Sequence, residues 1–396
     1  MPEGRSIPGG IRSGGGLVDT GSVRDGDAVC WDAIVVGAGP AGCAAAYDLS
    51  IAGRSVLLLD KADFPRPKAC AGGLTRKSLS ALRYSVTPVV RERPSAITVE
   101  KNAAESAVIR SLMPICAMTV RDELDDFCLR QTVEAGVQFE RIDPIETIDE
   151  MNREVHLRTR ARYFRAQFLV GADGVHSQVR RLTGEARWFR RGFALEANVR
   201  TPDAASAAMV FDLGTVSGGY GWVFPKGDHL NIGLYTIDSS EKLNRERLAT
   251  YIATRCGAVN TEQFVGQYLG FGAEQAETSS ARIFLVGDAG GFADPLTGEG
   301  IYGAIMSGQA AAKAIEGDLR GKKAAASAFM QATARLRADL RLSSAGARWF
   351  YAHPDTGYRV LTAPMLRSLV LRAYASGSGV AALAQAVKNI VEILPL

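Results

Sequence analysis

The chain has 396 residues, of which 47% are hydrophobic and 22% charged, and its formal net charge is +4. This length suits two interleaved lobes better than one small core. The near balance of acids and bases argues against nucleic acid as a partner, which needs a concentrated basic face. No apolar run reaches the ~18 residues that predict a membrane-spanning helix.

The numbers and spacings of cysteines and histidines bear on disulfides and metal sites. The six cysteines include no C-x-x-C pair and follow no secretory leader, which favours a reduced, cytoplasmic setting. The four histidines lack an H-x-x-x-H spacing, so we expect no metal site. Residues 1–29 are rich in glycine, serine and mixed charge, which predicts a flexible leader or a segment that the mature protein lacks.

The first predicted elements form a βαβ unit. An apolar strand, Ala33–Val36, precedes the G-x-G-x-x-G spacing of Gly37, Gly39 and Gly42, and an alanine-rich helix and a second strand ending on Asp60 follow. The first glycine permits a tight turn, the second lets a pyrophosphate approach the backbone, and the third lets helix and strand pack closely. The helix N-terminus favours the phosphate, and the Asp60 carboxylate is placed to accept from ribose hydroxyls.

The middle of the chain alternates between sheet and helix patterns. Short β segments such as Ala96–Glu100 are predicted within 79–113, and a helix over Val120–Ala135. Arg153–Gly171 is predicted as a hairpin that ends in a buried strand, Gln167–Val170. Residues 188–271 are again predicted as mostly strands and turns.

Two further strands end in motifs that suit a cofactor. The strand before Gly171-Ala172-Asp173-Gly174 places a carboxylate at the carboxyl edge of a parallel sheet, where ligands bind. The strand Arg282–Val286 runs into Gly287-Asp288, whose carboxylate is placed to accept from a ribityl hydroxyl. A small-residue helix that opens near Gly298 would aim its positive end at the pyrimidine side of a flavin.

This order predicts an α/β fold, a Rossmann-type FAD-binding domain interleaved with a mostly antiparallel substrate sheet and followed by C-terminal helices. The predicted boundaries are 30–78, 114–185 and 275–325 for the FAD domain, 79–113 and 186–274 for the sheet domain, and 326–396 for the helical region. A second loose G-x-G-x-x-A at Gly377 has no strand before it and is predicted as a helix-breaking turn.

Tyr220, Trp222 and Phe224 alternate along one predicted strand, so all three side chains face one side. They line either a substrate cavity or the core of the sheet. Pro225 ends the run, and because proline cannot donate to a sheet ladder it favours an edge strand or a cavity rim.

Cys70 lies in a loop rich in charge and glycine. If Arg66 and Lys68 lie close to it, these cations favour its thiolate. The alternative is that Cys70 is a small buried apolar residue without a chemical role.

These motifs, in this order, resemble the p-hydroxybenzoate hydroxylase-type flavoproteins, and within them the geranylgeranyl reductase family. Pro65–Leu74 is similar to that family's P-x-x-K-x-C-G-G segment, and Tyr220–Pro225 to its Y-x-W-x-F-P segment. Thr119–Arg121 with Asp125 and Leu129 resembles its V-x-R-x-x-F-D-x-x-L helix. The sequence departs from the pattern at Ala71, where the family has glycine, and at Leu124, where it has phenylalanine.

The resemblance implies an FAD-dependent enzyme that saturates double bonds of an isoprenoid lipid, with Cys70 catalytic and Tyr220, Trp222, Phe224 and Pro225 contacting substrate. Its expected FAD-binding residues are Gly37, Gly39, Pro40, Ala41, Gly42, Asp60, Lys61, Cys70, Ala71, Gly72, Arg121, Asp173, Gly287, Asp288, Pro295, Gly298, Gly300 and Ile301.

Other functions remain open on the same fold. A flavin monooxygenase or halogenase is one alternative, since Trp222 and Pro225 fit the halogenase W-x-W-x-I-P pattern while Tyr220 replaces its first tryptophan. A prenyl-lipid carrier would not need Asp60, Asp173 and Asp288 together. A disulfide reductase is disfavoured because the chain has neither a second nucleotide fingerprint nor a redox cysteine pair.

The electron donor is not evident from the sequence. No separate nicotinamide domain is visible, so either NAD(P)H docks transiently or a ferredoxin-like protein supplies electrons. The tail from Gly357 is basic and apolar, with Arg359, Arg367, Arg372 and Lys388 against Glu392. It forms either an amphipathic surface for peripheral contact with anionic lipid or a helix pair that caps the domain.

Overall fold

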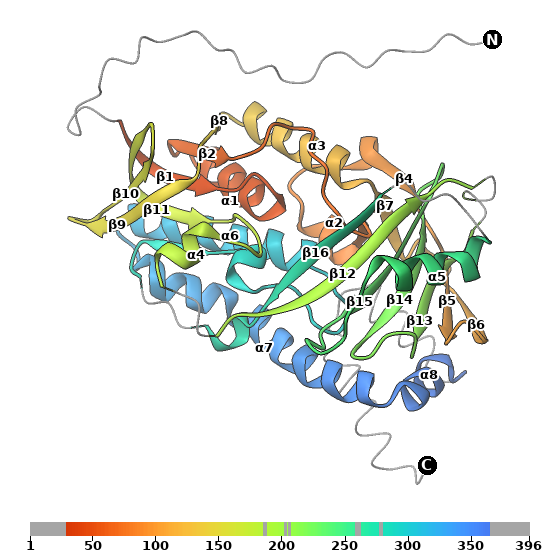
Figure 1. The fold of residues 1–396 in the computed structure, drawn as a ribbon. Helices are drawn as coiled ribbons and strands as arrows, with labels where there is room; N and C mark the ends of the chain where they lie inside the picture. The colour runs from red at the N-terminus through yellow and green to blue at the C-terminus, as the bar shows by residue number, and fades with distance from the viewer. Residues whose placement is uncertain are drawn as a thin grey trace, which may run out of the picture.

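The computed structural model describes residues 29–184, 188–201, 204, 207–257, 263–276 and 280–364, and the statements below concern these residues. The predicted leader, the Gly377 turn and the tail beyond Ala363–Pro364 therefore lie outside the described residues. Figure 1 shows the described chain as two lobes, each built around a sheet.

The first sheet has seven strands in the order β8-β2-β1-β11-β10-β9, and β17 also pairs with β11. Its centre is parallel and apolar, and all five residues of β2 are buried. β9 and β10 add an antiparallel hairpin beside the first half of β11. The strands are β1 (Cys30–Val36), β2 (Val56–Asp60), β8 (Gln138–Arg141), β9 (Ile145–Met151), β10 (Glu154–Thr159), β11 (Tyr163–Gly171) and β17 (Ile283–Leu285).

Small residues let two helices pack closely against this sheet. α1 (Pro40–Ile51) and α6 (Ile301–Leu319) approach so tightly that a Cβ on Gly308 would stand 2.3 Å from the Ala41 carbonyl oxygen. α3 (Arg121–Glu134) packs on α1, and the short α4 (Gln178–Leu182) follows β11. The glycine-rich turn after β17 is a short 3₁₀ helix, η4 (Gly287–Gly290).

The second sheet has seven strands in the order β16-β12-β15-β14-β13-β5-β6, antiparallel except for the β5–β13 pair. One face packs on α5 (Arg245–Cys256), and the other carries the aromatic residues of β14. Its strands are β5 (Ala96–Lys101), β6 (Glu105–Arg110), β12 (Arg190–Val199), β13 (Met209–Leu213), β14 (Gly219–Pro225), β15 (Leu230–Thr236) and β16 (Phe264–Phe271).

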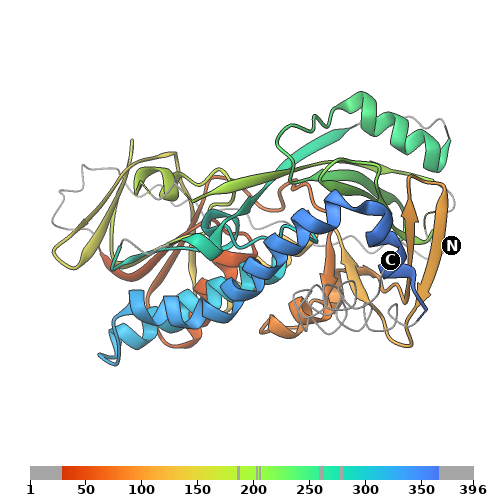
Figure 2. The same cartoon turned by 90° about the horizontal axis from the view of Figure 1, so that it is seen from below.

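A small third sheet and the last helices join the lobes. The third sheet has the order β3-β7-β4. Figure 2 shows α7 as a long helix that runs from the first lobe to the second, where α8 packs on β5. These elements are β3 (Gly73–Thr75), α2 (Arg76–Ala81), η1 (Thr87–Val89), β4 (Val90–Glu92), β7 (Cys116–Thr119), η3 (Ala273–Gln275), α7 (Ala325–Ala352) and α8 (Pro354–Thr362).

The structure confirms the α/β fold class and corrects one expectation about the second sheet. β14 lies between β13 and β15, so it is not an edge strand. Pro225 is tolerated there because it is the last residue of β14 and lies beyond the register that β13 covers, which ends at Val223. Within the described part of the chain, no helix combines the length and apolar character needed to cross a bilayer.

Candidate active site

The three sequence motifs meet at one edge of the first sheet. β1 and β11 are in register with Val36 beside Gly171, and β17 continues the row with Leu285 beside Gly171. The backbone of each strand end is tied to the next, since Ala172 N donates to Val36 O (2.7 Å) and Val286 N donates to Gly171 O (2.9 Å). The turns that follow these strands therefore lie side by side.

The first turn has the shape of a pyrophosphate cradle. Gly37 has a φ of +103°, and a Cβ on Gly42 would stand 1.8 Å from the Gly37 carbonyl oxygen. A Cβ on Gly39 would meet only the Arg66 guanidinium within 4 Å, at 3.7 Å, so the backbone is open here with a cation close by. α1 starts at Pro40 without a side-chain cap, so within the described part of the chain no side chain occupies the N–H groups of Ala41 and Gly42, which can bind phosphate oxygens. This turn fits FAD.

Asp60 braces the glycine turn. Its Oδ2 accepts from Ala38 N (2.8 Å) and its Oδ1 from Ala62 N (2.9 Å). A carboxylate has lone pairs for about four hydrogen bonds, so capacity remains for ribose hydroxyls. Lys61 is exposed beside it.

Asp173 lies at the same edge, but its carboxylate faces α4. It accepts from Ser177 Oγ, from Gln178 N (2.6 Å) and from Val179 N (3.2 Å). Burial raises its pKa, although these hydrogen bonds oppose that shift. Its contacts among the described residues are those of a helix cap, and its role toward the cofactor stays a prediction.

Arg180, one turn further along, links two of the motifs. It donates to Val175 O (2.7 Å) in the second motif and to Ala289 O (2.8 Å) in the third. The guanidinium also lies over the Phe189 ring at 3.5 Å. Arg180 thus fixes the position of the turn that carries Asp288.

Asp288 is half-buried and faces cations. Its Oδ2 accepts from Gly270 N (3.3 Å), and among the described residues Oδ1 has no hydrogen-bond donor. Burial raises its pKa, while Lys68, Arg121 and Arg180 act in the opposite direction. A free acceptor oxygen is what a ribityl hydroxyl requires.

The start of α6 stands close to this carboxylate. A Cβ on Gly300 would lie 3.2 Å from Asp288 Oδ1, so glycine leaves room for the approach. α6 begins at Ile301 with no side-chain cap and no acidic residue in its first turn. Its positive end is therefore free to face a bound group.

The loop before α6 is held by tyrosines of the second sheet. Tyr220 OH donates to Thr297 O (2.6 Å), and Tyr235 OH donates to Pro295 O (2.9 Å). A Cβ on Gly298, whose φ is +66°, would lie 3.3 Å from the Tyr220 hydroxyl. The aromatic strand and the cofactor loop are thus in direct contact.

The aromatic residues of β14 form one row, as the alternation predicted. The ring centroids of Tyr220 and Trp222 are 6.3 Å apart, and those of Trp222 and Phe224 are 6.4 Å apart. Trp222 and Phe224 are buried, and Trp222 Nε1 donates to Asn231 Oδ1 (2.7 Å). The row is both a wall beside the cofactor loop and part of a packed core, so its contact with substrate stays a prediction.

The Cys70 loop lies between the lobes. Cys70 Sγ accepts from Gly72 N (3.3 Å), and Cys70 N donates to Glu196 Oε1 (2.8 Å) on β12. Gly72 has a φ of +62°, and a Cβ there would stand 2.1 Å from the Thr119 carbonyl oxygen, so only glycine fits. Ala71 next to it is half-buried.

Arg121 and Lys226 both interact with the Cys70 thiol, and the Arg121 guanidinium also holds Asp125 through two hydrogen bonds of 2.9 and 3.0 Å. The cations expected there are engaged elsewhere. Arg66 pairs with Asp125 (3.4 Å), and Lys68 donates to Gln267 (2.7 Å). Neither Arg121 nor Lys226 was expected at the thiol from the sequence. The effect of Arg66 and Lys68 on the thiol stays a prediction.

Sequence reasoning missed two site residues, Glu196 and Lys226. Both are buried, and both contact the Cys70 loop. A carboxylate within the apolar run Phe193–Val199 and a lysine directly after Pro225 were the available signals.

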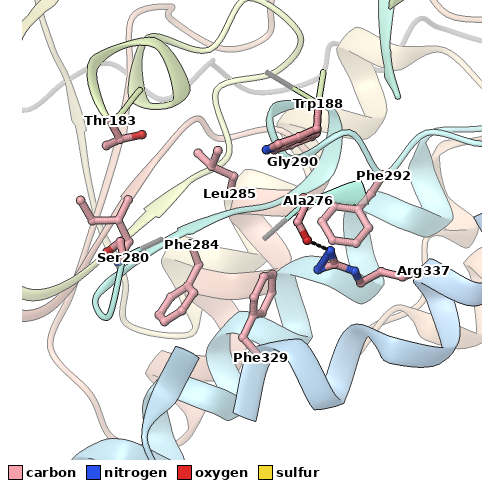
Figure 3. A pocket seen from close by; sticks show the side chains of 11 residues that line it. Thr183, Trp188, Ala276, Ser280, Phe284, Leu285, Gly290, Phe292, Phe329 and Arg337 are labelled. Atoms are coloured by element: carbon pink, nitrogen blue, oxygen red, sulfur yellow. Dashed lines mark hydrogen bonds between the residues drawn. The ribbon is translucent and has the colours of Figure 1, made fainter. Parts of the chain in front are cut away.

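A separate hollow lies between β17, η4 and α7 (Figure 3), and none of the predicted site residues lines it. Phe284, Phe292 and Phe329 form much of its wall, and the Arg337 guanidinium donates across it to the Ala276 carbonyl oxygen. The Trp188 Nε1 that borders it is buried and has no hydrogen-bond partner among the described residues.

Comparison with known proteins identifies the family of this chain. The family described as an FAD binding domain matches residues 31–337. An uncharacterized protein of Methanosarcina barkeri is 33% identical over 73% of this chain and 76% of its own length. Digeranylgeranylglycerophospholipid reductase 2 of Methanosphaera stadtmanae and menaquinone reductase of Mycobacterium tuberculosis are each 29% identical, over 70% and 72% of this chain and 75% and 76% of their own lengths.

Solved structures share the fold. A geranylgeranyl bacteriochlorophyll reductase-like protein from Thermoplasma acidophilum superposes with a TM-score of 0.75 at 20% identity, over 91% of this chain and 99% of its own. The flavin-dependent brominase Bmp2 gives a TM-score of 0.71 at 17% identity, over 92% and 100%. The chain belongs to the FAD binding domain family and is an FAD-dependent oxidoreductase related to the geranylgeranyl reductases.

Proposed function

We propose that this enzyme reduces carbon–carbon double bonds in the prenyl chain of an isoprenoid lipid. The observation that carries the proposal is the contact between the row Tyr220, Trp222 and Phe224 and the loop that leads from Asp288 to α6, through the Tyr220 hydroxyl and the Thr297 carbonyl. An apolar wall beside the cofactor loop suits a substrate that has no polar group near its reacting carbons.

FAD, when bound and reduced, supplies the hydride for one alkene carbon. The protein must hold the alkene against the ring, exclude water and provide a proton for the other carbon. The aromatic row serves the first two tasks. We assign the donation of this proton to the Sγ of Cys70, which is half-buried and interacts with Arg121.

The names of relatives support a prenyl substrate and leave the head group open. One relative is named for a digeranylgeranyl phospholipid and another for menaquinone. The Bmp2 likeness at 17% identity concerns the fold alone and does not favour halogenation. The electron donor, NAD(P)H or a ferredoxin-like protein, and peripheral membrane contact are part of the proposal; the basic tail that would make such contact lies largely outside the described residues.

The test is anaerobic incubation of the FAD-loaded protein with a chemical reductant and prenyl lipids that carry phospholipid, diphosphate or quinone head groups. Mass spectrometry of the extracted lipid should show a gain of two hydrogens for each reduced bond. Incubation in air with a halide salt is the comparison. Gain of oxygen or halogen there, without saturation in the anaerobic arm, would replace the proposal with a monooxygenase or halogenase.

A further inference from the structure

Two buried ionisable side chains hold the Cys70 loop from the second sheet. Glu196 lies in β12 and is 8% exposed, and Lys226 directly follows β14 and is 2% exposed. Burying a charge is costly unless hydrogen bonds or an opposite charge compensate. The contacts of Glu196 and Lys226 therefore show which groups compensate their burial.

Glu196 connects the loop to the aromatic strand. Its Oε1 accepts from Cys70 N (2.8 Å), and its carboxylate also interacts with Asn231. Asn231 in turn accepts from Trp222 Nε1 (2.7 Å) and donates to Asn198 (3.0 Å). One carboxylate thus ties the Cys70 backbone to the residue expected to contact substrate.

Lys226 holds the other side of the same loop. Its Nζ donates to the Ala71 carbonyl oxygen and to the Thr119 carbonyl oxygen (3.0 Å). A Cβ on Gly72 would stand 2.8 Å from Nζ, so the ammonium lies directly against the loop. The Glu196 carboxylate therefore holds the Cys70 N–H, and the Lys226 ammonium holds the Ala71 carbonyl.

The two side chains act on each other and on the thiol. Burial lowers the pKa of Lys226 to about 8, although Cys70 and Glu196 oppose that shift. Burial raises the pKa of Glu196, against hydrogen bonds from Cys70 N and Asn231 and the charges of Lys226 and Arg121. Neither forms a direct ion pair among the described residues, so the loop separates the two charges.

We propose that Glu196 and Lys226 are a positioning pair that fixes the Cys70 loop and sets the charge at the Cys70 thiol. Among the described residues, Arg121 from α3, Lys226 after β14 and Tyr220 from β14 interact with this thiol, and Glu196 from β12 accepts from the N–H of the same residue. A carboxylate near a thiol disfavours the thiolate, and an ammonium favours it. The catalytic consequence of this pair rests on the proposed function, whereas its effect on the loop and the thiol does not.

The test uses two variants that change charge and one that changes the hydrogen bond. Glu196→Gln keeps an oxygen for Cys70 N–H and removes the charge. Lys226→Met removes the ammonium and keeps much of the apolar stem. Glu196→Ala removes both the acceptor and the charge. Glu154→Gln, on the β9–β10 side of the first sheet, is the matched control.

The first measurement is alkylation of Cys70 by iodoacetamide in the FAD-loaded protein, read on the Cys70 peptide by mass spectrometry across a range of pH. We expect the half-point of alkylation to move by roughly one pH unit, downward in Glu196→Gln and upward in Lys226→Met. Glu154→Gln should match the wild type. Folded charge variants with an unchanged half-point would overturn the proposal.

The second measurement is hydrogen exchange of the Cys70 amide, which remains informative if a charge variant is poorly stable. Glu196→Ala should exchange this amide on the order of tenfold faster than Glu196→Gln, because only the glutamine retains an acceptor. Equal exchange in the two variants contradicts the contact. Both measurements need no substrate, so they stand even if no prenyl lipid is reduced.

Discussion

At the scale of single residues, the site depends on a few carboxylates whose surroundings differ. Asp60 and Asp173 accept from backbone N–H groups that begin or brace local turns, whereas Asp288 has no donor to Oδ1 among the described residues and faces three cations. The same residue type therefore serves structure at one strand end and is available to a ligand at another.

Replacing Asp288 separates these roles. We expect Asp288→Ala to bind FAD about tenfold more weakly, because it loses one charge-assisted acceptor for the cofactor. The flavin-to-protein absorbance ratio after dialysis is the measurement, with exposed Asp149→Ala as the control. Full flavin content in Asp288→Ala would contradict the assignment.

Cys70 offers a second test. We expect Cys70→Ala to retain FAD and to lose most of the steady-state reduction of substrate, because the side chain lies in a loop and not within an apolar strand. Flavin content, thermal melting and turnover are measured together. An unstable, flavin-free variant would mean that the thiol is structural, and normal turnover would remove it from the mechanism.

Lys226 makes stability depend on pH with a defined sign. Its pKa is about 8 in the folded protein and 10.5 in the unfolded chain, so the unfolded chain binds the extra proton between these values. The buried charge of Lys226 therefore lowers the free energy of unfolding by its full amount below pH 8. This destabilisation decreases as the pH rises toward 10.5. The free energy of unfolding of the wild type should rise relative to that of Lys226→Met between pH 8 and 10.5.

The size of that effect is about 1–2 kcal/mol between pH 7.5 and 9.5, below the limit of ~1.4 kcal/mol per pH unit for one group. Urea unfolding of both FAD-loaded proteins at the two pH values measures it. The comparison with Lys226→Met cancels the titration of those groups that do not interact with Lys226. A constant difference between the proteins would show that Lys226 does not titrate there.

At the scale of elements, β14 has two faces with different surroundings. Trp222 faces the aromatic row and stands over Gly233, where a Cβ would come within 2.2 Å of its ring. Val223 faces the opposite side, which packs on α5. Neighbouring residues of one strand therefore provide a matched pair for testing the substrate wall.

We expect Trp222→Phe to change the chain length or the number of reduced bonds in the product, because it enlarges the space beside the cofactor loop and frees Asn231. Val223→Ala should cost about 1–3 kcal/mol of stability and leave the products unchanged. Product profiles and melting of both FAD-loaded variants are compared. If Trp222→Phe lowers the melting temperature and leaves the products identical, the row is core only.

At the scale of the whole molecule, the cofactor site is formed by segments from both lobes. Gly270 at the end of β16 donates to Asp288, and tyrosines of β14 and β15 hold the loop before α6. Glu196 of β12 holds the Cys70 loop. Binding of FAD should therefore stabilise the lobes together.

We expect FAD to be held without a covalent bond, because these contacts are hydrogen bonds and helix ends and the sequence has no recognisable flavin-attachment motif. Acid precipitation should release the yellow colour into the supernatant, and a stripped protein should melt at a lower temperature until FAD is restored. Colour that stays in the pellet would contradict this expectation.

The sequence by itself determined the three turns of the cofactor site. Gly37, Gly39 and Gly42 act through local backbone geometry, and the strands before Asp173 and Asp288 are apolar enough to be recognised without tertiary information. Alternation alone placed Tyr220, Trp222 and Phe224 on one face. These features depend on residues close together in the chain, where periodicity and turn chemistry are sufficient.

Only the tertiary structure decided what those turns contact. Glu196 reaches Cys70 across 126 residues, and Lys226 reaches Ala71 across 155. It also placed Pro225 in a central strand, turned Asp173 toward α4 and put Arg121 and Lys226 at the Cys70 thiol. Such contacts depend on how the second sheet docks on the first lobe, and no local pattern in the sequence encodes that register.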